Sequence, residues 1–96
     1  GGSATLVRDD GTRVPLEGET ITVGRLSAST ITINDSNVSR RHAEIRRNRD
    51  HFVVVDLGST NGTTVNGTRI HGETTLSDGD VIGFGSATVR FEGSSS

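Results

Sequence analysis

The sequence predicts an all-β domain, a two-sheet β-sandwich of about eleven short, mainly antiparallel strands. Its apolar residues are mostly Val and Ile, and Thr is abundant; these β-branched residues favour strands over helices. Thirteen glycines against one proline indicate many tight turns. Turn residues recur every few positions, the segments between them alternate polar with apolar residues, and no helical period is present.

Four strands are expected in the first half of the chain, separated by turns rich in Gly, Ser or Asp. The second strand contains Pro15, which an edge strand tolerates because its outer backbone groups need no partner. The third alternates so that Ile21 and Val23 point inward. These strands cover residues 5–8, 13–16, 20–23 and 31–33.

Seven further strands are expected in the second half. The segment 52–55 is apolar at every position, which predicts a central strand covered on both faces. Asn66-Gly67, between two short strands, is typical of a hairpin turn. The seven strands cover residues 42–47, 52–55, 63–65, 69–70, 74–76, 81–84 and 87–91.

Length and composition limit the class of protein. Ninety-six residues suffice for one domain with one core. Residues 1–3 resemble a cloning remnant and residues 94–96 a linker-like tail, so the domain is expected at residues 4–93 of a piece excised from a longer protein. The absence of cysteine excludes disulfides and sulfur-ligated metals. No segment approaches the ~18 apolar residues of a membrane span, so we expect no direct membrane insertion.

Positive charge is concentrated in one segment of an acidic chain. The formal net charge is −2, which argues against a general polyanion binder. All basic residues are arginines, and six of the ten lie between Arg25 and Arg49, where the only acids are Asp35 and Glu44. Six positive charges less two negative ones give this segment a charge of +4.

The segment 38–67 collects hydrogen-bond donors suited to phosphate. Its expected loops carry hydroxyls, guanidiniums and an amide, which are the donors that a phosphate-binding surface requires. Ser, Thr, Asn and Gly are also ordinary turn residues, and that alternative explains the Gly and Asn residues but not the arginines. The donors are Ser39, Arg40, Arg41, Thr60 and Asn61.

Several other chemistries fit the chain poorly. A nucleotide-binding P-loop requires a lysine, which the chain lacks. His42, His51 and His71 have no metal-ligand spacing, so we expect no metal and no cofactor. Ser39 and His42 could form a nucleophile pair, but the sequence has no nucleophile elbow, so we expect no enzyme. No aromatic residues are interleaved with the arginines, so we expect no nucleic-acid binding.

Four blocks, in this order and spacing, resemble the signature of the forkhead-associated (FHA) domain. Together they are specific, although each alone is weak, and the resemblance covers residues from about 20 to about 92. The arginine pair and the length are similar to those of bacterial, particularly actinobacterial, members. The blocks are Gly24-Arg25, Ser39-Arg40-Arg41-His42, Gly58-Ser59-Thr60-Asn61-Gly62-Thr63 and Val65-Asn66-Gly67.

The resemblance implies a sandwich that binds phosphothreonine peptides through loops at one end. Arg25, Ser39 and Thr60 match the family positions that hold the phosphate, and Arg40 is an additional contact. Asn61 matches the position that hydrogen-bonds the peptide backbone. The positions that support or shape the binding loops are matched by Gly24, His42, Gly62, Asn66 and Gly67.

The chemistry of these residues agrees with that reading. A phosphothreonine carries a charge of about −1.5 to −2 and three acceptor oxygens. Arg25 and Arg40 can donate paired N–H bonds from a fixed fork. Asn61 has both a donor and an acceptor, which suits a peptide's own N–H and C=O groups. Arg41, Arg46, Arg47 and Arg49 are expected on the solvated surface.

We therefore read the chain as a non-catalytic phosphothreonine-recognition module of a Ser/Thr-kinase signalling protein. The expected partner is a phosphothreonine-containing protein, a Ser/Thr kinase or its substrate. The domain is expected to be monomeric and cytoplasmic, and to reach the inner face of the membrane only through a partner. The alternative is a scaffolding sandwich that binds partners without phosphate.

Overall fold

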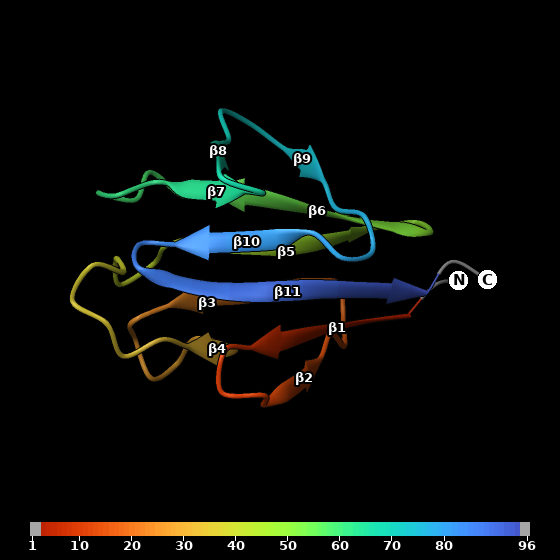
Figure 1. Ribbon diagram of the computed structural model, residues 1–96, viewed down its shortest axis with the longest axis horizontal. Helices are drawn as coiled ribbons and strands as arrows, with labels where there is room; N and C mark the ends of the chain where they lie inside the picture. Colours follow the sequence, from red (N-terminus) through yellow and green to blue (C-terminus); the bar gives the residue numbers. More distant parts are fainter. Residues whose placement is uncertain (1–2, 95–96) are drawn as a thin grey trace.

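Eleven strands form two sheets that pack face to face in the computed structural model, which describes residues 3–94 (Figure 1). Within this range no residue is helical, and so no helix could cross a membrane. The strands are β1 (Ser3–Arg8), β2 (Arg13–Pro15), β3 (Thr20–Gly24), β4 (Ile31–Thr32), β5 (Ala43–Asn48), β6 (His51–Asp56), β7 (Thr63–Val65), β8 (Thr68–Arg69), β9 (Thr74–Thr75), β10 (Val81–Phe84) and β11 (Ala87–Ser94).

The two sheets have different strand orders. The front sheet of Figure 1 has the order β2-β1-β11-β10-β7-β8, and the rear sheet has the order β4-β3-β5-β6-β9. Paired strands are antiparallel, with the short parallel pair β3–β4 as the exception. The all-β sandwich of short, mainly antiparallel strands is thus confirmed.

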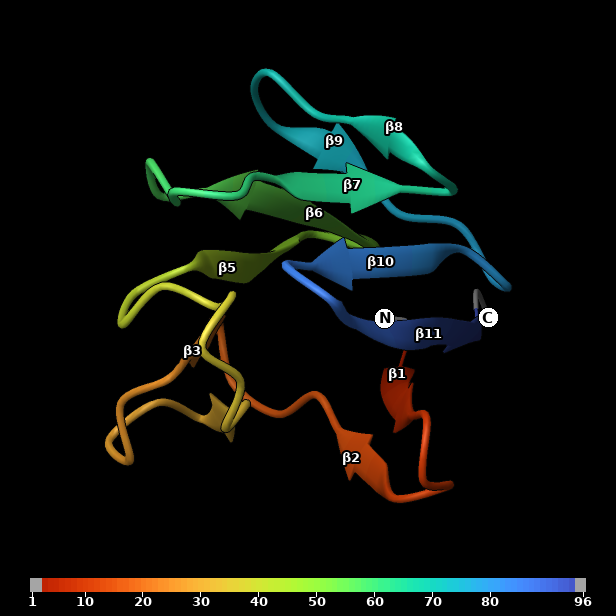
Figure 2. The same ribbon diagram turned by 60° about the vertical axis from the view of Figure 1, so that its left-hand side comes forward.

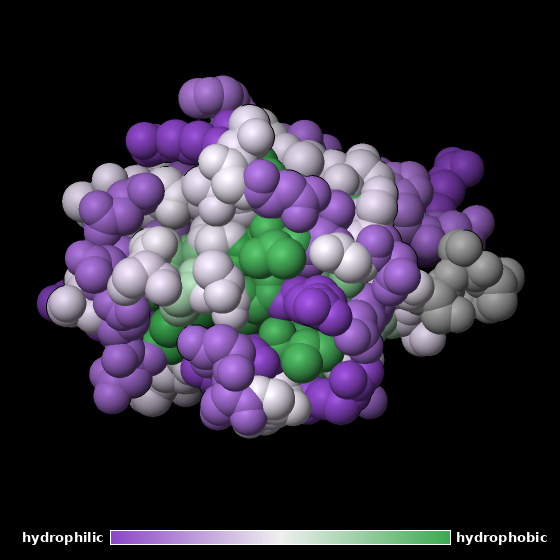
Figure 3. All heavy atoms as spheres, in the orientation of Figure 1, coloured by the Kyte–Doolittle hydropathy of each residue, from purple (hydrophilic) through white to green (hydrophobic). Residues whose placement is uncertain are grey.

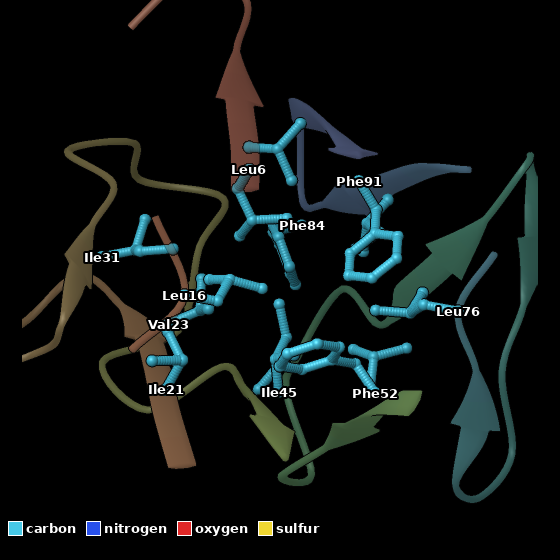
Figure 4. Close-up of a cluster of buried hydrophobic side chains, with 14 of the residues drawn as sticks. Leu6, Leu16, Ile21, Val23, Ile31, Ile45, Phe52, Leu76, Phe84 and Phe91 are labelled. Atoms are coloured by element: carbon cyan, nitrogen blue, oxygen red, sulfur yellow. The ribbon is translucent and has the colours of Figure 1, made fainter. Parts of the chain in front are cut away.

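The hydrophobic core fills the space between the sheets because alternate residues of each strand point inward. Leu6 on β1, Ile45 on β5 and Phe84 on β10 are completely buried there (Figure 4). The rings of Phe52 on β6 and Phe91 on β11 meet between the layers at an angle of 61°, with centroids 5.7 Å apart. Such inclined ring pairs are a favourable aromatic arrangement.

The apolar run of β6 has a different explanation from the predicted one. β6 is flanked by β5 and β9, and within residues 3–94 there are two sheets and no third layer over the outer face of its sheet. Phe52 and Val54 point into the core, whereas Val53 belongs to the outer face and is still only 5% exposed. Arg46 on β5 forms an ion pair with Glu73, next to β9, at 3.5 Å. Because β6 lies between β5 and β9, the Arg46–Glu73 ion pair spans the outer face of β6. Long side chains therefore cover this face in place of another layer of secondary structure.

The strand ends differ slightly from the expected domain limits. β1 begins at Ser3 and β11 ends at Ser94, and these two residues pair. The front sheet therefore extends one residue beyond each end of the domain expected at residues 4–93. Residues 1–2 and 95–96, which belong to the expected remnant and tail, lie outside the described residues.

Four connections lie together at one end of the sandwich. They are the segments 25–30, 33–42, 57–62 and 85–86, at the left of Figure 1 and again on one side in Figure 2. The N- and C-terminal strand ends and the β5–β6 turn lie at the opposite end. The fold thereby places the segments that carry most of the predicted binding residues side by side.

Candidate functional site

A hollow at this loop end brings together all five residues predicted to contact a ligand. Its walls come from three connections: β3–β4, β4–β5 and β6–β7. The residues that line it are Arg25, Ser36, Asn37, Val38, Ser39, Arg40, Thr60 and Asn61. None of these eight carries an acidic group, so the hollow presents positive charge and neutral hydrogen-bonding groups.

Only two arginines of the basic segment line the hollow, although the sequence clusters six of them. Arg46 is held by two glutamates at 2.8 and 3.5 Å, and Arg47 lies 4.7 Å from the centroid of the Phe52 ring. Both are half-buried, whereas Arg41 and Arg49 are exposed. The charge cluster of the sequence is therefore spread over several surfaces in the fold.

The backbone around Arg25 holds the β3–β4 connection against the β4–β5 loop. The N–H of Arg25 donates to the carbonyl oxygens of Ser39 and Arg40, both at 3.1 Å. Gly24 permits this approach, since a Cβ on it would lie 2.1 Å from the Arg40 carbonyl oxygen. A side chain at position 24 would therefore force the two segments apart.

Ser39 and Asn61 link the β4–β5 loop to the β6–β7 loop. The Oγ of Ser39 accepts a hydrogen bond from the backbone N–H of Thr60 at 3.0 Å, which leaves the hydroxyl proton to be donated elsewhere. The Nδ2 of Asn61 donates to the carbonyl oxygen of Asn37 at 2.8 Å. The amide oxygen of Asn61 can accept a further hydrogen bond.

His42 lies beneath these loops and is completely buried. Its Nδ1 accepts a hydrogen bond from the backbone N–H of Ser39 at 3.1 Å, so the proton is on Nε2, which donates to the carbonyl oxygen of Gly62 at 2.8 Å. The ring packs edge-on against Phe84 with centroids 5.7 Å apart. Both nitrogens are used by backbone groups, so the ring cannot act as a base for the Ser39 hydroxyl in this arrangement.

The family follows from comparison with known proteins. A model of the FHA domain matches residues 21–85, which is more than half of the chain. The chain belongs to the FHA-domain family.

Several known proteins resemble this chain over nearly its whole length. An oxoglutarate dehydrogenase inhibitor of Corynebacterium jeikeium (strain K411) is 46% identical over 94 residues, covering 94% of this chain and 65% of the relative. The FhaA FHA domain complexed with the intracellular domain of Rv3910 has a TM-score of 0.88 and 39% identity, covering 94% of this chain and all of that one. A structure from work on phosphothreonine-dependent FHA domain interactions has the same TM-score and identity, and covers 94% of this chain and 95% of that one.

The chain is shorter than the curated relatives. It spans between 48% and 65% of the lengths of four oxoglutarate dehydrogenase inhibitors from Corynebacterium species. The activities of those whole proteins are therefore not assigned to this FHA domain.

Asp56 organises the β6–β7 loop, and the sequence analysis missed it. One carboxylate oxygen accepts from the backbone N–H groups of Gly58 and Ser59, both at 3.0 Å. The other accepts from the hydroxyls of Ser59 at 2.5 Å and Thr63 at 2.7 Å. The Ser59 oxygen in turn accepts from the N–H of Gly62 at 2.9 Å. The pattern Asp-x-Gly-Ser after a strand is a signal for this arrangement, because Asp commonly bonds backbone groups two or three residues on.

The contacts of Asp56 set its protonation. Partial burial raises the pKa of Asp56, but the hydroxyls of Ser59 and Thr63 and the two backbone N–H groups outweigh that effect and bring the pKa below 3.8. The carboxylate is therefore charged at neutral pH while it holds the loop.

Gly62 is a tight point of the same loop. Its φ of +82° lies in the left-handed region, which glycine adopts without strain. A Cβ there would lie 2.7 Å from the Arg69 guanidinium. Glycine therefore fits both the backbone conformation and the space at this position.

Asn66 and Gly67 are not at the binding loops, which corrects the expected support role. They form the β7–β8 turn, with φ values of +53° and +85° as in a hairpin turn. The Asn66 side chain bonds Asp80 and the N–H of Val81, both at 3.0 Å. β7 runs away from the binding end, so its length separates this turn from the hollow (Figure 2). Through the bonds of Asn66 to Asp80 and Val81, this turn holds the start of β10 in place.

The lowered pKa of Asp56 gives a pH-dependent stability. The charged form stabilises the folded state above the unfolded pKa of about 3.8, and this contribution is lost as pH falls through the lower folded pKa. Replacing Asp56 by Asn should lower the free energy of unfolding at pH 7 by about 1–3 kcal/mol. It should also flatten the pH dependence below pH ~4. Urea unfolding at several pH values, with Asp50→Asn as control, tests this; identical pH profiles for Asp56→Asn and wild type would contradict it.

His42→Ala should weaken both the fold and ligand binding. The variant leaves the N–H of Ser39 and the carbonyl of Gly62 without their partner, and a buried group without its hydrogen bond costs about 1–3 kcal/mol. The melting temperature and phosphopeptide affinity should both fall, whereas the exposed His51→Ala should change neither. Unchanged melting with abolished binding would instead show direct contact between His42 and the ligand.

Proposed function

We propose that this FHA domain is a non-catalytic module that recognises phosphothreonine in a protein of Ser/Thr-kinase signalling. The observation that carries the proposal is the hollow at the loop end, where two guanidiniums meet the hydroxyls of Ser39 and Thr60 without an acidic neighbour in its lining. A peptide with one phosphorylated residue matches a donor set of this size. A general polyanion would require a wider basic surface than an acidic domain with two arginines in the hollow offers.

Four residues are proposed to donate hydrogen bonds to the phosphate, and they contribute in different ways. Arg25 and Arg40 supply charge and paired N–H groups to the phosphate oxygens. Ser39 and Thr60 supply short O–H donors from opposite loops. Because the Ser39 oxygen is already held by the N–H of Thr60, the hydroxyl is oriented before the ligand arrives. Little ordering is then required on binding, which favours affinity.

Asn61 is proposed to bind the peptide backbone. Its Nδ2 is tied to the β4–β5 loop, so the side chain is held at the rim of the hollow. The amide oxygen can accept from a peptide N–H, and the second amide proton can be donated to a peptide C=O. This contact is independent of the phosphate and positions the chain that carries it.

A catalytic role is disfavoured by the state of His42. A hydrolytic Ser–His pair requires a histidine nitrogen bonded to the serine oxygen. Here the contact at Nδ1 comes from the backbone N–H of Ser39, and the Ser39 oxygen is bonded by Thr60. Residues 3–94 also contain no group of three His, Asp or Glu side chains placed to hold a metal.

The proposed partner is a phosphothreonine-containing protein, a Ser/Thr kinase or its substrate, bound by a monomeric domain in the cytoplasm. The FhaA relative complexed with an intracellular domain and the work on phosphothreonine-dependent interactions support this choice. A domain bound in this way would reach the inner face of the membrane through its partner. Screening an oriented phosphothreonine peptide library would define the preferred sequence.

Phosphate-independent scaffolding is a second candidate, because the front sheet has an uncovered apolar patch. Val81 is 40% exposed and pairs with Arg90, which pairs with Val7 on the other side. Figure 3 shows hydrophobic surface around the middle of this face. Phosphatase treatment of the partner separates the two candidates, since binding through this face would persist.

Removing one phosphate donor should abolish most binding without unfolding the domain. Arg25→Ala and Ser39→Ala should each weaken phosphopeptide binding by about 2–5 kcal/mol, because each leaves a charged partner incompletely bonded. Arg49→Asn is a matched control: it removes a charge at the opposite end, and Asn tolerates the φ of +60° found there. Calorimetry gives the affinities, and near-wild-type binding by either alanine variant would refute the assignment of that residue.

The domain should prefer phosphothreonine over phosphoserine by about tenfold or more. Burying the extra methyl contributes about 0.8 kcal/mol, and β-branching restricts the rotamer before binding. We expect the methyl to lie between the loops of Ser39 and Asn61, which both border the hollow. A Glu-containing peptide brings one charge and two oxygens, so it should bind barely detectably. Titration of phosphothreonine, phosphoserine, Glu and Thr peptides tests this; equal affinity for both phosphopeptides would exclude the methyl pocket.

A further inference from the structure

The tip of the β10–β11 hairpin is bonded to the loop that carries Ser39, although it supplies no residue to the hollow. The hydroxyl of Ser86 donates to Asp35 at 2.5 Å and accepts from the side-chain amide of Asn37 at 3.2 Å. Ser86 lies 51 positions from Asp35 in the sequence, so these are tertiary contacts.

Asp35, which accepts the hydrogen bond from Ser86, also accepts hydrogen bonds from the backbone of the β4–β5 loop. Its other carboxylate oxygen accepts from the N–H of Asn37 at 2.8 Å, and its carbonyl accepts from the N–H of Val38 at 3.0 Å. Val38 is buried in the core and directly precedes Ser39. The hydroxyl of Ser86, followed by the N–H of Asn37, lowers the pKa of Asp35, which keeps the carboxylate charged and accepting.

Asn37 then joins the hairpin tip to the third loop. Its carbonyl oxygen accepts from the side chain of Asn61 at 2.8 Å. Gly85 packs against the same carbonyl: a Cβ on Gly85 would lie 2.4 Å from that oxygen, and its φ is +63°. The hairpin tip, the β4–β5 loop and the β6–β7 loop therefore meet at one peptide group.

We infer that Ser86 is a positioning residue of the phosphate site, acting through Asp35 and Asn37 on Ser39 and Asn61. The inference rests on the proposed function, and it assigns the β10–β11 hairpin a part in binding that requires no contact with the ligand. Without the Ser86 hydroxyl, the β4–β5 loop would lose the hydrogen bonds of Asp35 and Asn37 to the front sheet. The Asn37 carbonyl would then be held for Asn61 less firmly, by the Asp35 bond and the packing of Gly85.

The test compares Ser86→Ala with Ser86→Thr, which keeps the hydroxyl. With a phosphothreonine peptide selected from the oriented library, Ser86→Ala should lose about three- to tenfold in affinity, the size of one typical hydrogen bond. Ser86→Thr should bind the peptide with nearly wild-type affinity. Ser77→Ala, a change to an exposed serine at the other end of the domain, should bind like wild type. Wild-type affinity of Ser86→Ala would overturn the inference.

A double-mutant cycle distinguishes positioning from general destabilisation. Asp35→Asn should weaken binding as Ser86→Ala does, and the double variant should be little worse than either single one because both remove the same link. The melting temperatures of Ser86→Ala and wild type should agree within a few degrees, since the groups are exposed. Additive losses of affinity would contradict the link.

Amide hydrogen exchange in the free protein tests whether Ser86 positions the loops. This test works even if no library peptide binds, although that outcome would refute the proposed function. The N–H of Thr60, bonded to the Ser39 hydroxyl, and the N–H of Val38 should exchange faster in Ser86→Ala than in wild type. The N–H of Leu76, bonded at the far end, should be unchanged. Equal exchange at Thr60 and Val38 in both proteins would overturn the inference.

Discussion

The binding end of this FHA domain depends on one buried imidazole. His42 joins the N–H of Ser39 to the carbonyl of Gly62, and these two groups belong to different loops. The Gly62 carbonyl is buried and the Ser39 N–H is partly buried, so the loss of either hydrogen bond would be costly. The edge contact with Phe84 fixes the ring to the core. The geometry of the loops is therefore set by the same layer of residues that holds the sandwich together.

Above this layer, short polar side chains replace hydrophobic packing. Asp56 closes the β6–β7 loop on itself, Ser39 binds that loop to its neighbour, and Asp35 connects the neighbour to a hairpin of the other sheet. Such side chain-to-backbone bonds satisfy peptide groups that no strand partner reaches. They also leave Arg25 and Arg40 exposed at the rim, where positive charge is not neutralised by the protein's own acids.

The pairing of some arginines with acidic residues, but not of others, explains how an acidic protein can present an anion site. Arg46 is neutralised by two glutamates on the outer face of the rear sheet, and Arg13 pairs with Glu92 at 2.6 Å on the front sheet. Exposed pairs of this kind contribute little to stability. They pair these two arginines with acids away from the hollow, whereas Arg25 and Arg40 line the hollow, whose lining contains no acidic residue.

The sequence by itself determined the strands and part of the core, and it predicted the residues that the fold brings together at the hollow. Alternation and turn residues act over a few positions, so the eleven strands could be read from local pattern, and the motif blocks identified Arg25, Ser39, Arg40, Thr60 and Asn61. Three features were decided only by the tertiary structure. These are which arginines line the hollow, the hydrogen bond of Asn66 to Asp80 before β10, and the hydrogen bond of Ser86 to Asp35. Those contacts join segments up to 51 positions apart, and their bonds are made to groups whose position depends on how the two sheets pack.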